Sequence, residues 1–140
     1  MNNVDPVEVT LAVQVHRTTV AVHLQIKNRG NHPVLIEQIN PNFPSPLPHE
    51  FEVTSDDKEI AYIGPMIKRI PYSRDDFRWL QPSAEIVRNL NIGDLFNFLP
   101  GHHEYKIIHT HLRYDEASGK ITEHVSSPSF FKVFVDLPNS

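Results

Sequence analysis

The chain of 140 residues contains no cysteine, which excludes a disulfide framework, a thiol nucleophile and a zinc site built on cysteines. It also lacks an apolar run of the roughly 20 residues that cross a bilayer, and its first residues have no signal-peptide pattern. With a formal net charge of −4, the chain lacks the basic excess that a nucleic-acid backbone requires. We therefore expect neither a membrane nor a nucleic acid as partner. A cytoplasmic protein is favoured, and secretion stays open for a processed domain.

Two stretches near the N-terminus alternate regularly between apolar and polar residues. In 7–15 the odd positions are apolar, and in 20–26 the even positions are. A period of two predicts strands with one buried face. The change of parity across 16–19 predicts a short turn that keeps both apolar faces on one core. The chain is therefore expected to begin with an antiparallel hairpin.

Further short strands are predicted along the chain, separated by turns that its 12 prolines and 5 glycines mark. We expect strands at 33–39, 50–53, 60–70, 85–90, 105–114 and 130–135, a proline-rich crossover at 41–48, a charged loop at 72–81 and one helical turn at 94–98. Many short strands with turns between them are typical of a β-sandwich. We predict a single all-β domain over 1–140, an antiparallel β-sandwich of seven to nine strands. The expected core includes Val9, Leu11, Val13, Val22, Leu24, Ile86, Ile108, Leu112 and Val133.

Motifs for catalysis are missing from the sequence. There is neither a glycine-rich phosphate loop nor a serine nucleophile elbow. His103 and Glu104 begin like the zincin motif H-E-x-x-H, which needs two histidines one helical turn apart. The next histidine is His109, which falls in a predicted strand. We expect no enzyme and no cofactor.

The nine histidines are the most unusual feature of the composition. His109 and His111 lie two positions apart in a predicted strand and so share one face. They are candidates for a metal site if a neighbouring strand supplies a third ligand. The favoured alternative is a polar strand face in water, with Ile108, Leu112 and Tyr114 in the core.

The segment 70–79 interleaves arginines with aromatic residues. This composition is typical of interface centres, and the loops of a sandwich commonly carry its recognition surfaces. We predict a contact patch for a protein partner, made of Tyr72, Arg74, Phe77 and Arg78. The alternative is that Phe77 and Trp79 close one end of the sandwich.

Several segments, mostly between residues 79 and 120, resemble parts of a known domain. They are Leu80-Gln81-Pro82 before a strand, the segment 91–98 after it, Pro100-Gly101 with Tyr105 at the start of the long strand, the turn 114–120 and the turn 27–34. In these features the chain resembles the immunoglobulin-like β-sandwich domain that precedes the catalytic domain in deuterolysin-type, peptidyl-Lys metalloendopeptidases. The resemblance implies an immunoglobulin-like fold.

The same resemblance implies an accessory role. These 140 residues have no counterpart of the zinc-binding catalytic domain, so no catalytic residue is carried over. The expected function is a noncatalytic binding module whose protein partner is a protease. Free-standing proteinase inhibitors of bacteria resemble the same sandwiches, so inhibition is an alternative function. A histidine-based metal-binding protein is another.

Overall fold

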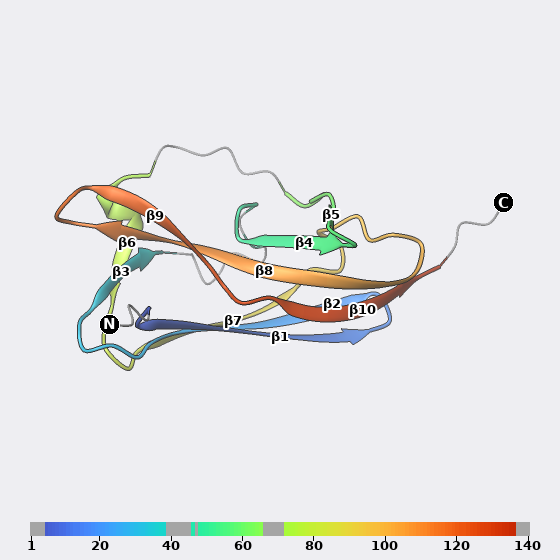
Figure 1. Ribbon diagram of the computed structural model, residues 1–140, viewed down its shortest axis with the longest axis horizontal. Helices are drawn as coiled ribbons and strands as arrows, with labels where there is room; N and C mark the ends of the chain where they lie inside the picture. The colour runs from blue at the N-terminus through green and yellow to red at the C-terminus, as the bar shows by residue number, and fades with distance from the viewer. Residues whose placement is uncertain (1–4, 39–45, 47, 66–71, 137–140) are drawn as a thin grey trace.

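The computed structural model describes residues 5–38, 46, 48–65 and 72–136. They form two antiparallel β-sheets that pack face to face (Figure 1). The predicted all-β, antiparallel sandwich is therefore confirmed. Within the described residues, no helix has the length and apolar character needed to cross a membrane.

The smaller sheet contains β1 (Val7–His16), β2 (Thr19–Asn28) and β7 (Glu85–Asn91) in the order β1-β2-β7. A tight turn at Arg17, which has a φ of 57°, joins β1 to β2. Leu11 lies opposite Leu24, as the alternation of apolar residues predicts. The apolar face of the central strand β2 is fully buried, whereas that of β1 is mostly half-buried because β1 is an edge strand. Val9, Leu11 and Val13 thus pack against the core without being fully enclosed.

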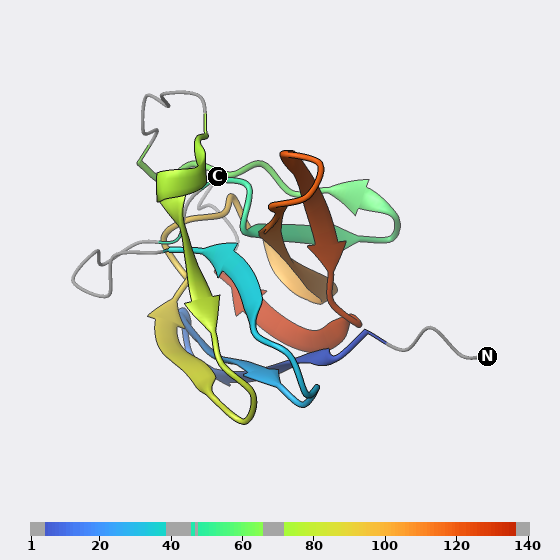
Figure 2. The ribbon, with the colours of Figure 1, turned by 90° about the vertical axis from the view of Figure 1, so that its left-hand side faces the viewer.

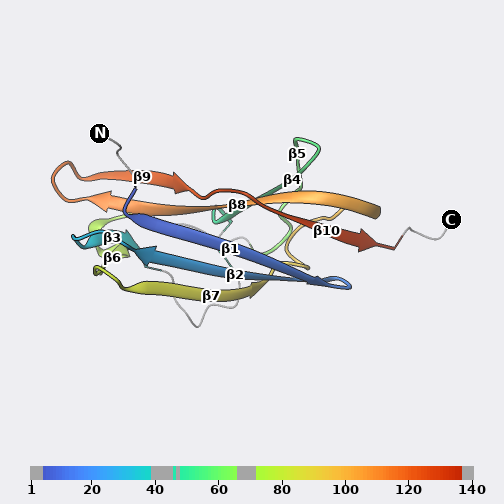
Figure 3. The same ribbon diagram turned by 60° about the horizontal axis from the view of Figure 1, so that its bottom comes forward.

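The larger sheet surrounds the long strand β8 (Gly101–Asp115), beside which β9 and β10 run in succession (Figure 3). Its other strands are β3 (Val34–Glu37), β4 (Phe51–Ser55), the two-residue β5 (Lys58–Glu59), β6 (Phe77–Leu80), β9 (Lys120–Val125) and β10 (Ser129–Val135). Along one edge of β8, β4 pairs with residues 106–109 and β3 pairs with Arg113, while β5 and β6 extend the sheet beyond β4 and β3. Along the other edge of β8, β10 pairs with residues 101–107 and β9 with residues 110–115. This arrangement, set against β1-β2-β7, is that of an immunoglobulin-like sandwich.

The main core lies between the sheets, where Leu24, Tyr105 and Ile107 are at most 1% exposed. A second, smaller apolar cluster lies on the outer face of the larger sheet. It consists of Leu35, Phe77 and Leu112, with Tyr72 and Tyr114 against them. The short 3-10 helix η1 (Arg74–Asp76) lies just before β6 at this end of the sandwich (Figure 2). The strand β8 is therefore covered on both faces along its second half.

The prediction for the core residues was correct in part. Val22, Leu24, Leu112 and Val133 are buried, and Ile86 is half-buried against the core. Ile108 is also half-buried, but Ile107 takes the core position that was predicted for it.

Four segments differ from the sequence-based expectation. Residues 72–81 contain η1 and β6 rather than only a loop, and β9 was not predicted at all. Residues 94–98 form no helical turn, because their backbone forms hydrogen bonds with residues 61–63 instead. The Ile63 N–H donates to the Leu95 carbonyl, and the Asn97 N–H donates to the Ala61 carbonyl. The predicted strand 60–70 is reduced, in its described part, to the single bridge between Tyr62 and Phe96. The crossover 41–48 lies outside the described residues except for Pro46 and Pro48.

Candidate functional site

A buried ion pair joins the two sheets inside the sandwich. Arg88 lies on β7 opposite Leu24, and its Nη1 donates to Oε1 of Glu50, which directly precedes β4. The Glu50 side chain has no exposed surface, and Nε2 of His109 lies 3.3 Å from the same oxygen. The edge of the Phe51 ring also packs on His109, with 5.0 Å between the ring centroids. Glu50 thus holds two basic side chains from different strands.

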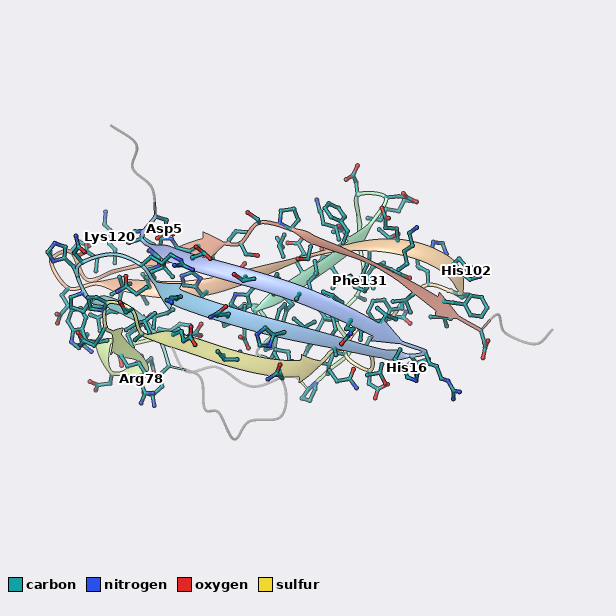
Figure 4. All side chains as sticks on the ribbon, turned by 90° about the horizontal axis from the view of Figure 1, so that it is seen from below. Asp5, His16, Arg78, His102, Lys120 and Phe131 are labelled. Carbon is teal, nitrogen blue, oxygen red and sulfur yellow. The ribbon has the colours of Figure 1, made fainter. Side chains whose placement is uncertain are left out.

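Three histidine rings continue from this ion pair as a stack. The ring centroids of His109 and His111 are 6.4 Å apart and those of His111 and His124 are 5.3 Å apart, with 19° between the planes in both pairs. His111 is 3% exposed, and its Nε2 accepts a hydrogen bond of 2.9 Å from Nε of Arg113. Nη2 of Arg113 also donates to Asp5 Oδ2, at 2.6 Å. Figure 4 places Asp5 at the same end of the molecule as Lys120.

The surroundings of the stack keep the imidazoles of His111 and His124 neutral. Burial lowers the pKa of His111 to about 3, and the positive charge of Arg113 and the neighbouring histidines add to this effect. Burial and Arg113 also lower the pKa of His124. Burial raises the pKa of Asp5, but the hydrogen bonds from Arg113 and the Val7 amide outweigh it, so this pKa is lowered overall. His111 and His124 are therefore uncharged rings next to the charged side chains of Arg113 and Asp5.

The expectation that His109 and His111 lie on a strand face in water was wrong. Both are buried between the sheets, and Leu112 on the opposite face packs in the outer cluster. Two neighbours of the stack, Glu50 and Arg88, are distant in sequence, and the spacing of histidines within one strand carries no information on them. The sequence showed the excess of histidine but not the partners that bury it.

The rings of the stack are poorly arranged for metal binding. Nearly parallel rings direct their in-plane nitrogen lone pairs side by side rather than at one point, and Nε2 of His111 already accepts from Arg113. Within the described residues, no three side chains of His, Cys, Asp or Glu are grouped so that they could hold a metal ion.

The residues of the predicted contact patch have different surroundings. Phe77 is 3% exposed and packs with Leu35 and Leu112, so its ring is enclosed as the alternative interpretation held. The hydroxyl of Tyr72 donates to Glu37, a buried side chain that also accepts from His49 at 3.0 Å.

The two arginines of this patch are more accessible. Nε of Arg74 lies 3.2 Å from Glu116 Oε2, and its guanidinium lies 5.8 Å from the centroid of the exposed Trp79 ring. Arg78 is exposed on β6. Trp79 is 45% exposed and does not close the end of the sandwich. The contact patch itself stays a prediction, with Arg74 and Arg78 as its accessible members.

A row of exposed apolar side chains follows β9 and β10. This β9–β10 strip consists of Ile121, Val125, Phe130 and Phe134, which are 39%, 59%, 63% and 46% exposed. These residues lie opposite Tyr114, Thr110, Lys106 and His102 of β8, on the outer face of the larger sheet. The Phe134 ring stacks on His102 with 4.3 Å between centroids. The sequence contained a signal for the strip, because apolar residues occupy both faces of the strand at 130–135.

No family model and no curated protein sequence matches this chain.

Proposed function

We propose that this domain is a noncatalytic binding module for a protein partner, and that the partner covers the β9–β10 strip. The observation that carries this proposal is the concentration of exposed apolar surface on that strip. Of the eight large apolar side chains that are exposed in the described part of the chain, four belong to it.

The composition of the strip favours a protein as the occupant. Contiguous apolar surface on a protein is typical of interaction sites, and aromatic side chains are enriched at the centres of protein interfaces. Phe130 and Phe134 provide such aromatic centres on a rigid strand that needs no ordering when it binds. Lys132 lies between Phe130 and Phe134 on the same outer face, and Lys106 lies opposite Phe130, so charged groups accompany the aromatic side chains.

The polar side chains around His124 support a noncatalytic role. The arrangement that most resembles a catalytic one places Thr122 Oγ1 2.8 Å from Nε2 of His124, with Asp5 behind the ring. The second ring nitrogen of His124 is 3.7 Å from Asp5 Oδ2, beyond hydrogen-bonding distance, and this oxygen already accepts from Arg113. A hydroxyl nucleophile needs a base that a third group orients by a hydrogen bond, and here that bond is missing.

The resemblance to the domain that precedes the catalytic domain of deuterolysin-type metalloendopeptidases supports a protease as the partner. If the partner is a protease, inhibition of that protease by the domain is an alternative function that an activity assay can measure. The module either positions the enzyme without changing its activity or blocks it.

A photo-crosslinking amino acid at position 130 tests the proposal in the source cell. We expect crosslinks to an endopeptidase, identified by mass spectrometry, from position 130 and not from a control variant with the crosslinker at position 79. Crosslinks from position 79 alone would assign the contact to the Arg74 side of the molecule and contradict the proposal. The activity of the purified partner, measured with and without the domain, then separates an accessory module from an inhibitor.

A further inference from the structure

A cavity of about 260 Å³ lies between the two sheets, and its lining includes residues of β6 and β7. These two strands are next to each other at one side of the sandwich (Figure 2, Figure 3). Its walls include the apolar side chains of Ile26, Ile36 and Ile86. The polar groups that line it include Arg78, Arg88 and His111. This cavity lies away from the β9–β10 strip, which is on the outer face of the larger sheet.

Two buried nitrogen donors of this lining have no hydrogen-bond partner. They are Nη2 of Arg88 and Nδ1 of His111. The Nε2 atom of His111 accepts from Arg113, so in the neutral ring the proton lies on Nδ1. His111 is 3% exposed, so water at the surface does not satisfy this N–H group. A buried donor without a partner costs free energy, and its presence in a cavity indicates that a bound group supplies the acceptor.

The unused donors of the cavity favour a strong hydrogen-bond acceptor such as an anionic group. Nη1 of Arg88 donates to Glu50, and the guanidinium retains the donors on Nη2 for a second acceptor. Arg78 adds a second positive charge at the exposed edge.

Two carboxylates also line the cavity, and both already accept hydrogen bonds. Glu37 accepts from His49 and from Tyr72. Glu85 accepts from Nε2 of Gln25, at 2.5 Å. These bonds give the two carboxylates hydrogen-bond partners outside the cavity's free donors, whereas Arg88 Nη2 and the imidazole N–H of His111 have no acceptor.

We propose that this cavity binds a carboxylate group attached to a small branched or aromatic apolar body. The carboxylate accepts from Arg88 and His111 and faces Arg78, and the apolar body packs on Ile26, Ile36 and Ile86. Such a carboxylate belongs either to a free organic acid or to the C-terminus of a peptide. A pair of arginines recognises both sources in the same way.

Nuclear magnetic resonance of the side-chain nitrogens tests the proposal directly. Isovalerate is the free-acid probe, and isovaleramide is its uncharged control. N-acetyl-Ala-Val with a free C-terminus is the peptide probe, and its C-terminal amide is the control. We expect at least one acid to shift the signals of His111 Nδ1 and Arg88 at millimolar concentration. The corresponding amide should bind at least about tenfold more weakly than the acid.

An Arg78→Gln variant measures the contribution of the exposed arginine without disturbing the buried ion pair. We expect it to weaken binding of the acid about five- to tenfold, as loss of a charged hydrogen-bond donor does. Arg17→Gln, in the β1–β2 turn, is the matched control and should leave binding unchanged. The proposal would be overturned if acid and amide bound equally, or if the Arg78→Gln and Arg17→Gln variants bound the acid equally. It would also be overturned if neither acid shifted the signals of His111 and Arg88. The last result would mean that water alone fills the cavity.

Discussion

His111 on β8 and His124 on β9 lie directly opposite each other and stack with their ring planes 19° apart. Burial and, after it, the charge of Arg113, which donates to the first ring, lower the pKa of both imidazoles. The domain therefore contains an uncharged pair of imidazoles within a polar interior. This pair makes the stability of the fold depend on pH.

The free energy of unfolding should decrease as the pH falls below 6.5. The pKa of His111 is about 3 in the folded protein, against 6.5 in the unfolded chain, so the unfolded chain takes up the proton first. The stability is complete above pH 6.5 and is lost as the pH falls towards 3, by about 2.5 kcal/mol between pH 7 and 4.5 from this residue alone. His124 contributes in the same direction.

Urea unfolding at pH 7, 6, 5 and 4.5 measures this dependence. A His111→Gln variant should lose most of the slope, and His16→Gln, at an exposed position, should retain it. The same slope in both variants would show that His111 is not the residue responsible.

Removal of Glu50 should strongly destabilise the domain. Glu50→Ala leaves Arg88 buried without its carboxylate, and breaking a buried pair in this way costs about 3–5 kcal/mol. Glu52→Ala, on the exposed face of β4, is the control and should change stability by less than about 0.5 kcal/mol. The double variant Glu50→Leu/Arg88→Met should regain much of the loss, because no uncompensated charge remains. Chemical denaturation of the four proteins checks these values.

Phe77 should contribute to stability rather than to a contact surface. Its ring packs between Tyr72 and Tyr114, with centroid distances of 5.8 and 5.5 Å. Phe77→Ala is therefore expected to cost about 3–5 kcal/mol. Arg78→Ala, the next residue and exposed, should cost less than about 0.5 kcal/mol. Thermal unfolding of both variants measures the difference, and a Phe77→Ala protein as stable as the parent would contradict the packing described here.

The domain should have no hydrolytic activity of its own. Thr122 and His124 lie within hydrogen-bonding distance, but Asp5 is bound to Arg113 and does not orient the imidazole. Peptidase, esterase and phosphatase assays with and without zinc should stay at background. Activity that Thr122→Ala or His124→Ala abolishes would show that this pair is catalytic.

The first hairpin could be predicted from the sequence in detail, because β1 and β2 each have one apolar face and a two-residue turn fixes their register. For β8 the apolar pattern was ambiguous. Its apolar residues fall on both parities, since Ile107 faces the main core while Leu112 faces the outer cluster. A strand that is covered on both faces does not show a period of two.

The candidate sites were harder to predict because they depend on distant partners. His109 meets Glu50, which is 59 positions earlier in the chain. The strand β9 was missed because, like many edge strands, it is short and mostly exposed, and its two apolar residues do not face the core. The contact patch was predicted from composition alone, and composition does not distinguish an enclosed Phe77 from an exposed Phe130.

The most direct test of the proposed function is the affinity of the crosslinked partner for three proteins: the parent, Phe130→Ser/Phe134→Ser and a Trp79→Ser control. If the β9–β10 strip is the contact surface, the double variant should bind at least about 30-fold more weakly, because the loss of even one aromatic residue at an interface centre costs about 2 kcal/mol or more. The control should bind like the parent. An unchanged affinity of a double variant that remains folded by circular dichroism would contradict the account.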